Sequence, residues 1–284
     1  MKANAIIRIV LYCAVILVLV GILVCGLSFG LFSGRRSLSL YNVDTAGTVT
    51  SSGSTSASGI RELDIDWVSG SITIQPGDTD SISYQETGVA DSKYQMVVSE
   101  SGGTLTIRYT KTSNFPSFGL SGNLRKNLEI TVPRDWSCDE LKLNVASADV
   151  TISDLTIREA DFNSASGVCT FENCQVTDLD VDTASGDIRF TGTLDTLECD
   201  AASASFRGIL DNCPSRISMD SASGGLDLTL PADAGFTLDK STLSGDFFSD
   251  FPTTNQNRKY ICGNGYCRID FSAASGDITI RKGA

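Results

Sequence analysis

Apolar residues recur along this chain in short alternating runs on either side of an Ala-Ser-Gly corner. The pattern is clearest at Thr183–Phe190 and again at Ala273–Ile280. In each copy the positions six and four residues before the serine, and three and five after it, are mostly apolar, whereas the positions between them are mostly polar. This twofold alternation is typical of β-strands with one buried side. Each copy therefore predicts a strand, a tight corner and a second strand.

The corner occurs eight times, and its serines follow a regular period. The serines are Ser69, Ser147, Ser166, Ser185, Ser203, Ser223, Ser244 and Ser275. From Ser147 to Ser244 the spacings are 19, 19, 18, 20 and 21 residues. A period of this length is typical of a solenoid, because one copy cannot bury its apolar positions and must stack on its neighbours. We therefore predict an all-β parallel β-helix (β-solenoid) of rungs about 19 residues long, stacked at about 4.8 Å.

The amino-terminal part of the chain predicts a membrane anchor. After a short tail at residues 1–8, residues 9–32 contain no charged residue. A run of this length fits a transmembrane helix and is too long for a cleavable signal peptide, and no A-x-A cleavage site follows it. We expect the amino terminus inside the cell, with the large carboxyl-terminal domain outside. Residues 33–59, rich in Ser, Thr and Gly, predict a flexible tether.

The rest of the chain divides into two β regions. Residues 60–135 predict the first rung and a β cap, with a hairpin at Ser101–Gly103 and an aromatic loop at residues 114–122. Residues 136–284 predict the solenoid, with an insertion at about residues 249–266. We expect the last repeat, which ends at Ile280, to leave unpaired strand edges at the carboxyl end, where another protein can add a strand.

Charge and composition exclude several classes of function. The chain has 34 acidic and 22 basic residues, a net charge of −12, and beyond Arg36 the net charge is −16. A surface this acidic repels phosphates, and we therefore expect no nucleic acid partner. Histidine is absent from the sequence. This excludes Ser-His-Asp and Cys-His catalysis and every metal site that uses histidine.

Seven cysteines follow the predicted anchor. Cys262 and Cys267 bracket a Gly-Asn-Gly-Tyr turn at hairpin spacing, which predicts a disulfide rather than a metal site. Cys169 and Cys199 fall in apolar columns and predict buried thiols. Cys174 and Cys213 share similar turn contexts but sit two rungs apart, which is too far for a direct bond. At least one thiol is expected to be free, and we expect no cofactor.

One acidic column is a candidate catalytic or calcium-binding feature. Its members stand two residues after a corner serine: Asp149, Asp187, Asp246 and Asp277. Stacked carboxylates of this kind act in glycoside hydrolysis or bind Ca²⁺. The competing interpretation is that they hydrogen-bond the turn backbone. We favour that interpretation because Val168, Ser205 and Gly225 interrupt the column and no second acidic column is evident.

Asn127–Pro133, followed by Leu141–Ile152 and then by successive Ser-Gly-Asp rungs, resembles the bacterial β-strand-repeat family of the DUF4097 type, labelled "putative adhesin". The resemblance covers about residues 60–280. It implies a single-pass membrane protein of the kind found in Gram-positive bacteria, some members being linked to cell-envelope stress systems. It assigns no catalytic residues. The cysteine content and the insertion before Cys262 depart from the family pattern.

These features together predict a non-enzymatic module on the outer face of a bacterial cell membrane. It would act as an adhesin-like protein or as an envelope-stress accessory protein, and bind a protein or another component of the cell envelope. The first alternative is a polysaccharide-active enzyme that uses the aspartates of the acidic column. The second is an accessory sensor whose partner docks on the last repeat.

Overall fold

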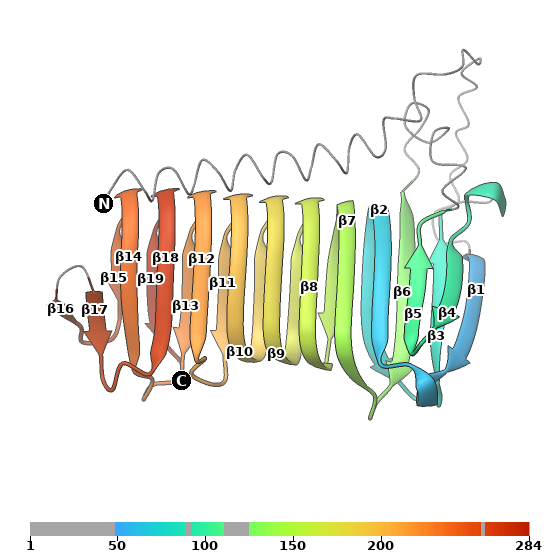
Figure 1. The fold of residues 1–284 in the computed structure, drawn as a ribbon, viewed down its shortest axis with the longest axis horizontal. Helices are drawn as coiled ribbons and strands as arrows, with labels where there is room; N and C mark the ends of the chain where they lie inside the picture. The colour runs from blue at the N-terminus through green and yellow to red at the C-terminus, as the bar shows by residue number, and fades with distance from the viewer. Residues whose placement is uncertain (1–48, 89–91, 111–124, 257–258, 284) are drawn as a thin grey trace, which may run out of the picture.

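The computed structural model describes residues 49–88, 92–110, 125–256 and 259–283, and these residues form an almost entirely β structure (Figure 1). The strands are β1 (Val49–Ser56), β2 (Glu62–Gly77), β3 (Ser81–Thr87), β4 (Val97–Ser101), β5 (Thr104–Arg108), β6 (Lys126–Pro133), β7 (Ser137–Ser153), β8 (Thr156–Ser166), β9 (Cys169–Ser185), β10 (Ile188–Ser203), β11 (Phe206–Leu210), β12 (Arg216–Ser223), β13 (Leu226–Leu230), β14 (Phe236–Ser244), β15 (Phe247–Ser249), β16 (Thr254–Gln256), β17 (Lys259–Cys262), β18 (Cys267–Ser275) and β19 (Ile278–Lys282). Two single-turn 3₁₀ helices, η1 (Ala57–Gly59) and η2 (Ser92–Tyr94), connect strands near the amino-terminal end.

The predicted anchor at residues 9–32 and the aromatic loop at residues 114–122 lie outside the described residues. Within the described ranges, no helix has the length and the apolar character needed to cross a bilayer.

The repeats pair in parallel with their corner serines in register. Ser69 lies opposite Ser147, and Ser147 lies opposite Ser166. Farther along the stack, Ser203 lies opposite Ser223. The sequence period is therefore the spacing from one paired strand to the next, as predicted.

The corners divide each rung into two faces. The strand segments before the corner serines form what we call face A, and the segments after them form face B. Strands β2 and β7 run through the corner, and β9 and β10 continue from face B of one rung into face A of the next, so hydrogen bonds join all these strands into one large sheet. The apolar columns of both faces meet in a single hydrophobic cluster, in which Val181 of face A and Phe190 of face B are each at most 1% exposed. This arrangement confirms the predicted inward columns.

Glycine at the corner permits the close approach of neighbouring rungs. Gly186 has a φ of 123°, which L side chains rarely adopt. A methyl group at this position would overlap the backbone carbonyl oxygen of Gly167 in the neighbouring rung. The repeated small residue is thus required by both the backbone conformation and the stacking distance at this corner.

The order of strands in space differs from their order in the chain at the carboxyl-terminal end. Along face A the neighbours run β4, β5, β2, β7, β8, β9, β10, β12, β18, β14, β17 and β16, and along face B they run β1, β3, β6, β2, β7, β9, β10, β11, β13, β19 and β15. The last repeat, β18 and β19, is inserted between β12–β13 and β14–β15 (Figure 1).

The prediction that the last repeat leaves free edges is therefore wrong. Strand β18 pairs with β12 on one side and with β14 on the other. The segment at residues 249–266 makes this possible, because it carries the chain outward from β15 and returns it to the gap that the β14–β15 rung leaves open. The predicted docking edge on this repeat is already used within the fold.

Antiparallel strands cover much of both ends of the stack. At one end β17 pairs with β14 and forms a hairpin with β16, within the predicted insertion. At the other end β4 pairs with β5, through the predicted turn at Ser101–Gly103, and β1 pairs with β3. Such additions protect the backbone groups of terminal strands from other chains.

The prediction of a flexible tether is wrong for the residues nearest the β domain. Residues 33–59 were expected to remain flexible, but Val49–Ser56 forms β1 and residues 57–59 form η1. From Ser51 on, partly buried and exposed positions alternate along β1, and the strand pairs with β3. Composition alone predicts flexibility here, whereas the available edge of β3 converts the segment into a strand.

Candidate functional site

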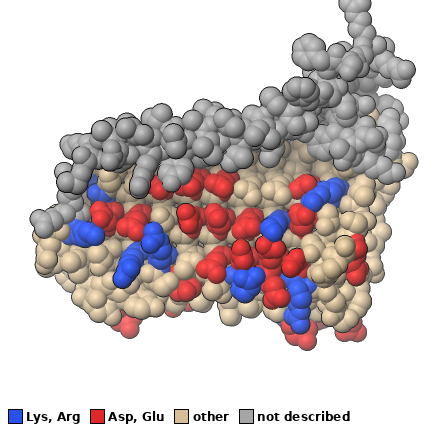
Figure 2. Space-filling model, in the orientation of Figure 1, with Lys and Arg blue, Asp and Glu red and all other residues tan. Residues whose placement is uncertain are grey.

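The outward side of face A carries rows of carboxylates. Seven of them form what we call the acidic face: Asp161, Asp178, Asp180, Asp182, Glu198, Asp200 and Asp220. The parallel register places these side chains opposite one another, so that Asp180 lies opposite Glu198 and Asp182 lies opposite Asp200. Figure 2 shows rows of acidic side chains across the strands of this side of the molecule. Because neighbouring strands are about 4.8 Å apart, like charges repeat at that distance along the stack.

This crowding changes the protonation of the acidic face. Partial burial, together with repulsion from Asp182, Glu198 and Asp161, raises the pKa of Asp180 to about 6. Partial burial, followed by repulsion from Asp220 and other neighbouring carboxylates, likewise raises the pKa of Asp200 to about 6. The folded chain thus holds these carboxylates close together at neutral pH despite an electrostatic cost.

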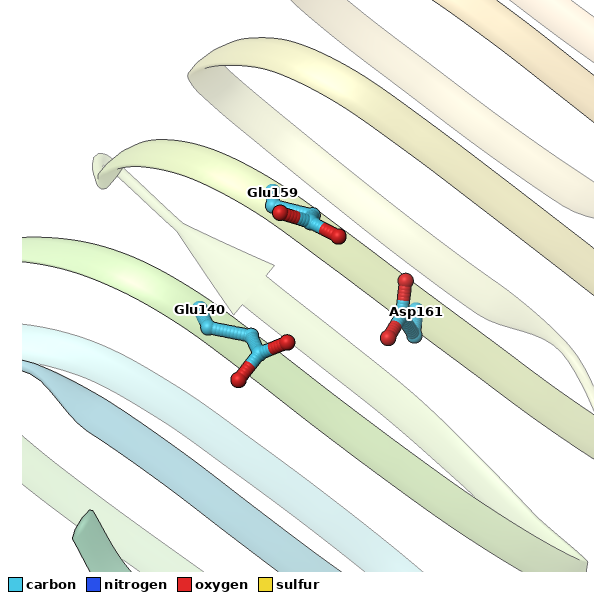
Figure 3. Close-up of side chains that lie close together, drawn as sticks. All are labelled: Glu140, Glu159 and Asp161. Atoms are coloured by element: carbon cyan, nitrogen blue, oxygen red, sulfur yellow. The ribbon is translucent and has the colours of Figure 1, made fainter.

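Three carboxylates, one of which is Asp161 of the acidic face, come close enough to share a cation. The ligand oxygens of Glu140, Glu159 and Asp161 lie within 4.8 Å of one another, and Figure 3 shows them on two neighbouring strands. Two of them already have cationic partners. Lys142 Nζ lies 2.7 Å from Glu140, and Arg158 Nη1 lies 2.9 Å from Glu159. These ion pairs offset the charge that would attract a metal ion.

The acidic column predicted at the corners is engaged in turn contacts. Asp149 Oδ1 accepts a hydrogen bond from the backbone N–H of Val168 at 3.0 Å, and Asp277 Oδ1 accepts one from the N–H of Asp246 at 2.8 Å. Asp187 lies 3.7 Å from Arg207. In spatial order only Asp277 and Asp246 occupy adjacent rungs, because β18 pairs with β14. These contacts agree with the turn interpretation of the column.

The expectation that no second acidic column exists is wrong. Carboxylates stand five residues before the corner serine in six of the eight repeats and three residues before it in four of them. The same period that identified the inward columns could have identified these rows, since outward positions alternate with inward ones.

The predicted disulfide between Cys262 and Cys267 is absent, and all seven cysteines of the described residues are free thiols. Strand β14 separates the two residues, since Phe236 pairs with Cys262 on one edge and with Cys267 on the other. Two strand spacings amount to nearly 10 Å, which exceeds the reach of a disulfide. Cys169 and Cys199 are buried, as predicted.

Cys267 instead lies near Cys213, because the Gly235 carbonyl oxygen accepts hydrogen bonds from the Cys267 N–H at 2.9 Å and from Cys213 Sγ at 3.5 Å. The sequence pointed to neither member of this pair as a partner of the other. The contact depends on the insertion of β18 beside β12, which the linear period does not predict.

A buried charged pair holds the amino-terminal cap. Lys126 and Glu86 form an ion pair, and both side chains are fully buried. Lys126 Nζ donates a hydrogen bond to the carbonyl oxygen of Tyr94 at 2.9 Å and lies 3.9 Å from the centre of the Tyr109 ring. Burial lowers the pKa of Lys126 to about 8. The pair ties β6 to β3, and we assign it a structural role.

The fold and the acidic rows define a class of protein: a stack of β rungs that displays repeated charged side chains on an outer face. The chain belongs to the Toastrack DUF4097 family, whose model matches residues 60–196 and 139–281. This confirms the resemblance drawn from the sequence, whereas the membrane anchor remains a prediction. No curated protein matches the chain.

Several solved structures are similar to this chain at low sequence identity. One is described as a putative adhesin from Bacteroides fragilis, with 15% identity, a TM-score of 0.47, and 85% of this chain and 100% of that chain covered. Another is described as a putative cell adhesion protein from Clostridium sporogenes, with 12% identity, a TM-score of 0.41, and coverage of 82% and 99%. A third, described as a putative lipid binding protein from Parabacteroides distasonis, has 14% identity, a TM-score of 0.31, and coverage of 85% and 99%.

Proposed function

We propose that this chain is a non-enzymatic, adhesin-like binding module, a β-solenoid anchored in a bacterial cell membrane by residues 9–32. The large domain faces outward and binds a cationic protein or another cationic component of the cell envelope through the acidic face. The observation that carries this proposal is the row of carboxylates held opposite one another in parallel register, as in Asp182 and Asp200.

Two properties of the acidic face support a binding role. It is extended and built on hydrogen-bonded strands, so a partner meets side chains that are already positioned. Its charge is concentrated around Asp180 and Asp200, since each is flanked by further carboxylates. A cationic partner would relieve this repulsion, which makes charge complementarity favourable for both association rate and specificity.

The experiment compares two triple variants with equal changes in charge. The first, Asp180→Asn/Asp182→Asn/Asp200→Asn, removes charge from the acidic face. The control, Glu129→Gln/Glu172→Gln/Asp227→Asn, removes charge from outward positions of face B. The full-length chain in detergent is tested by biolayer interferometry against isolated bacterial cell envelopes, with a lysine-rich peptide as a defined probe.

We expect the face A variant to bind about tenfold more weakly than the unmodified chain at low salt, and the control to bind as the unmodified chain does. Raising the salt concentration should reduce the difference, because exposed charges are screened. Equal binding by the two variants would show that the acidic face is not the contact surface.

The polysaccharide-active enzyme remains the alternative. Release of reducing sugar from envelope polysaccharides that disappears in Asp187→Asn would favour it over the binding module. We prefer the binding function because Asp149 and Asp277 already hold corner backbone groups.

A further inference from the structure

Two thiols from distant parts of the chain meet at the seam where the last repeat is inserted. Cys213 lies in the segment between β11 and β12, and Cys267 is the first residue of β18. Both are free thiols. The backbone carbonyl of Gly235 accepts a hydrogen bond from the Cys267 N–H at 2.9 Å and another from Cys213 Sγ at 3.5 Å. One carbonyl group therefore holds both residues in place.

The two thiols differ in their access to solvent. Cys267 is fully buried, whereas Cys213 is half-buried and lines a pocket of about 310 Å³. Asn264 and Tyr266 also line the pocket, and the side chain of Tyr266 is largely exposed. A small molecule that enters this pocket reaches the sulfur of Cys213 and not that of Cys267.

We propose that Cys213 and Cys267 form a redox-active dithiol, in which Cys213 is the entry thiol and Cys267 is the resolving thiol. The oxidant is a low-molecular-weight disulfide or the disulfide of a thiol oxidoreductase. The product is a disulfide that ties the segment before β12 to the inserted strand β18.

The reaction proceeds by two thiol–disulfide exchanges. The Cys213 thiolate attacks one sulfur of the donor disulfide RSSR, whose S–S bond breaks, and one RS⁻ leaves and takes up a proton. Cys267 then attacks the Cys213 sulfur of the mixed disulfide and expels the second RS⁻, which takes up the proton that Cys267 releases. The sum converts two protein thiols and RSSR into one protein disulfide and two RSH, so the protein is oxidised and the donor is reduced.

The electrostatics of the pair agree with this order of attack. Interaction with Cys267 lowers the pKa of Cys213, whereas interaction with Cys213, followed by burial, raises the pKa of Cys267. A lowered pKa increases the thiolate fraction of Cys213 at neutral pH, and the thiolate is the attacking form in this exchange. Cys262, also near this seam, has a raised pKa because of burial. It is therefore the matched control among the neighbouring thiols.

The test uses the full-length chain in detergent, incubated under native conditions with oxidised glutathione at pH 8. Free thiols are then alkylated, and a non-reducing digest is mapped by mass spectrometry. The unmodified chain should yield a peptide pair linked through Cys213 and Cys267. Closing this loop of more than fifty residues should raise the Tm by roughly 5–10 °C, reversibly on reduction.

Single variants separate the two roles. Cys267→Ser should trap a stable glutathione adduct on Cys213, because no resolving thiol remains. Cys213→Ser should leave Cys267 unmodified, since that thiol is buried. Cys262→Ser should form the disulfide as the unmodified chain does. The proposal is overturned if both Cys213 and Cys267 of the unmodified chain remain fully alkylated after oxidation, or if the mapped disulfide contains Cys262.

Discussion

Neutralising two carboxylates of the acidic face should make the protein more stable at neutral pH. Asp180 and Asp200 lie on neighbouring strands that each have further carboxylates beside them, and partial burial and this repulsion raise both pKa values to about 6. The double variant Asp180→Asn/Asp200→Asn keeps the size and the polarity of both side chains and removes only the charge. Asn and Asp have similarly low strand propensity, so the change should add little local cost.

The magnitude follows from linkage between protonation and folding. A rise in the pKa of an aspartate from 3.8 to about 6 corresponds to about 3 kcal/mol of unfavourable free energy for the charged form. Both side chains are partly exposed, so solvent screening reduces this to about 1 kcal/mol each. We therefore expect the double variant to raise the free energy of unfolding by about 2 kcal/mol at pH 7.5.

The pH dependence of folding stability shows whether these two carboxylates stabilise or destabilise the folded state. Between about pH 4 and pH 6 the folded state binds more protons at these two sites than the unfolded chain does, so lowering the pH through this window stabilises the unmodified protein. The advantage of the variant should therefore be largest above pH 6 and should vanish near pH 4.

The assay is urea unfolding followed by the fluorescence of Trp67 and Trp136, both buried and the two tryptophans of the chain. A gain at pH 7.5 that persists unchanged at pH 4, or no gain at either pH, would contradict the argument. The first result would mean that Asn stabilises by a contact of its own, and the second that the carboxylates do not repel one another appreciably.

Two further substitutions test the packing of the amino-terminal cap and of the corner. Lys126→Met should lower the free energy of unfolding by about 3–5 kcal/mol, because Glu86 would remain buried without a counter-charge. Lys126→Met/Glu86→Gln should recover most of this loss in the same urea assay, and an equal loss in both variants would argue against the pair. Gly186→Ala should destabilise by about 2–4 kcal/mol, because it adds strain at a positive φ and overlap with Gly167. Gly59→Ala, where no atom lies within 4 Å of the added carbon, should change stability by less than about 0.5 kcal/mol, and equal losses would refute the explanation of the corner.

The sequence predicts the body of the stack because each rung repeats the same local requirement. The side chains of Val181 and Phe190 can be buried only if inward and outward positions alternate along each strand and the neighbouring rungs align. The sequence period therefore predicts which residues are buried. The ends do not follow this rule. Strand β1 depends on the free edge of β3, and the insertion of β18 depends on the gap beside β12. Both are pairings between distant segments, and no local pattern records them.

The same distinction applies to the candidate sites. The rows of the acidic face are periodic, so they were predictable from outward positions such as Asp180 and Asp200. The contact between Cys213 and Cys267 was not predictable, because it exists only once β18 lies beside β12. Spacing within the chain favoured Cys262 as the partner of Cys267, and the strand between them prevents that bond.

The acidic face is not a requirement of the fold, and the neighbouring rungs show why. In the column that contains Asp182 and Asp200, two adjacent rungs carry Asn144 and Asn163 instead, and Asn163 Nδ2 donates a hydrogen bond to Asn144 Oδ1 at 3.3 Å. A row of neutral side chains that hydrogen-bond one another is therefore compatible with this backbone. Carboxylates at the central rungs give up such contacts and repel one another. A surface feature that lowers stability where a neutral alternative fits is typical of a functional site, because binding to a partner offsets the cost. This is the physical reason for placing the partner on face A rather than on the corner aspartates.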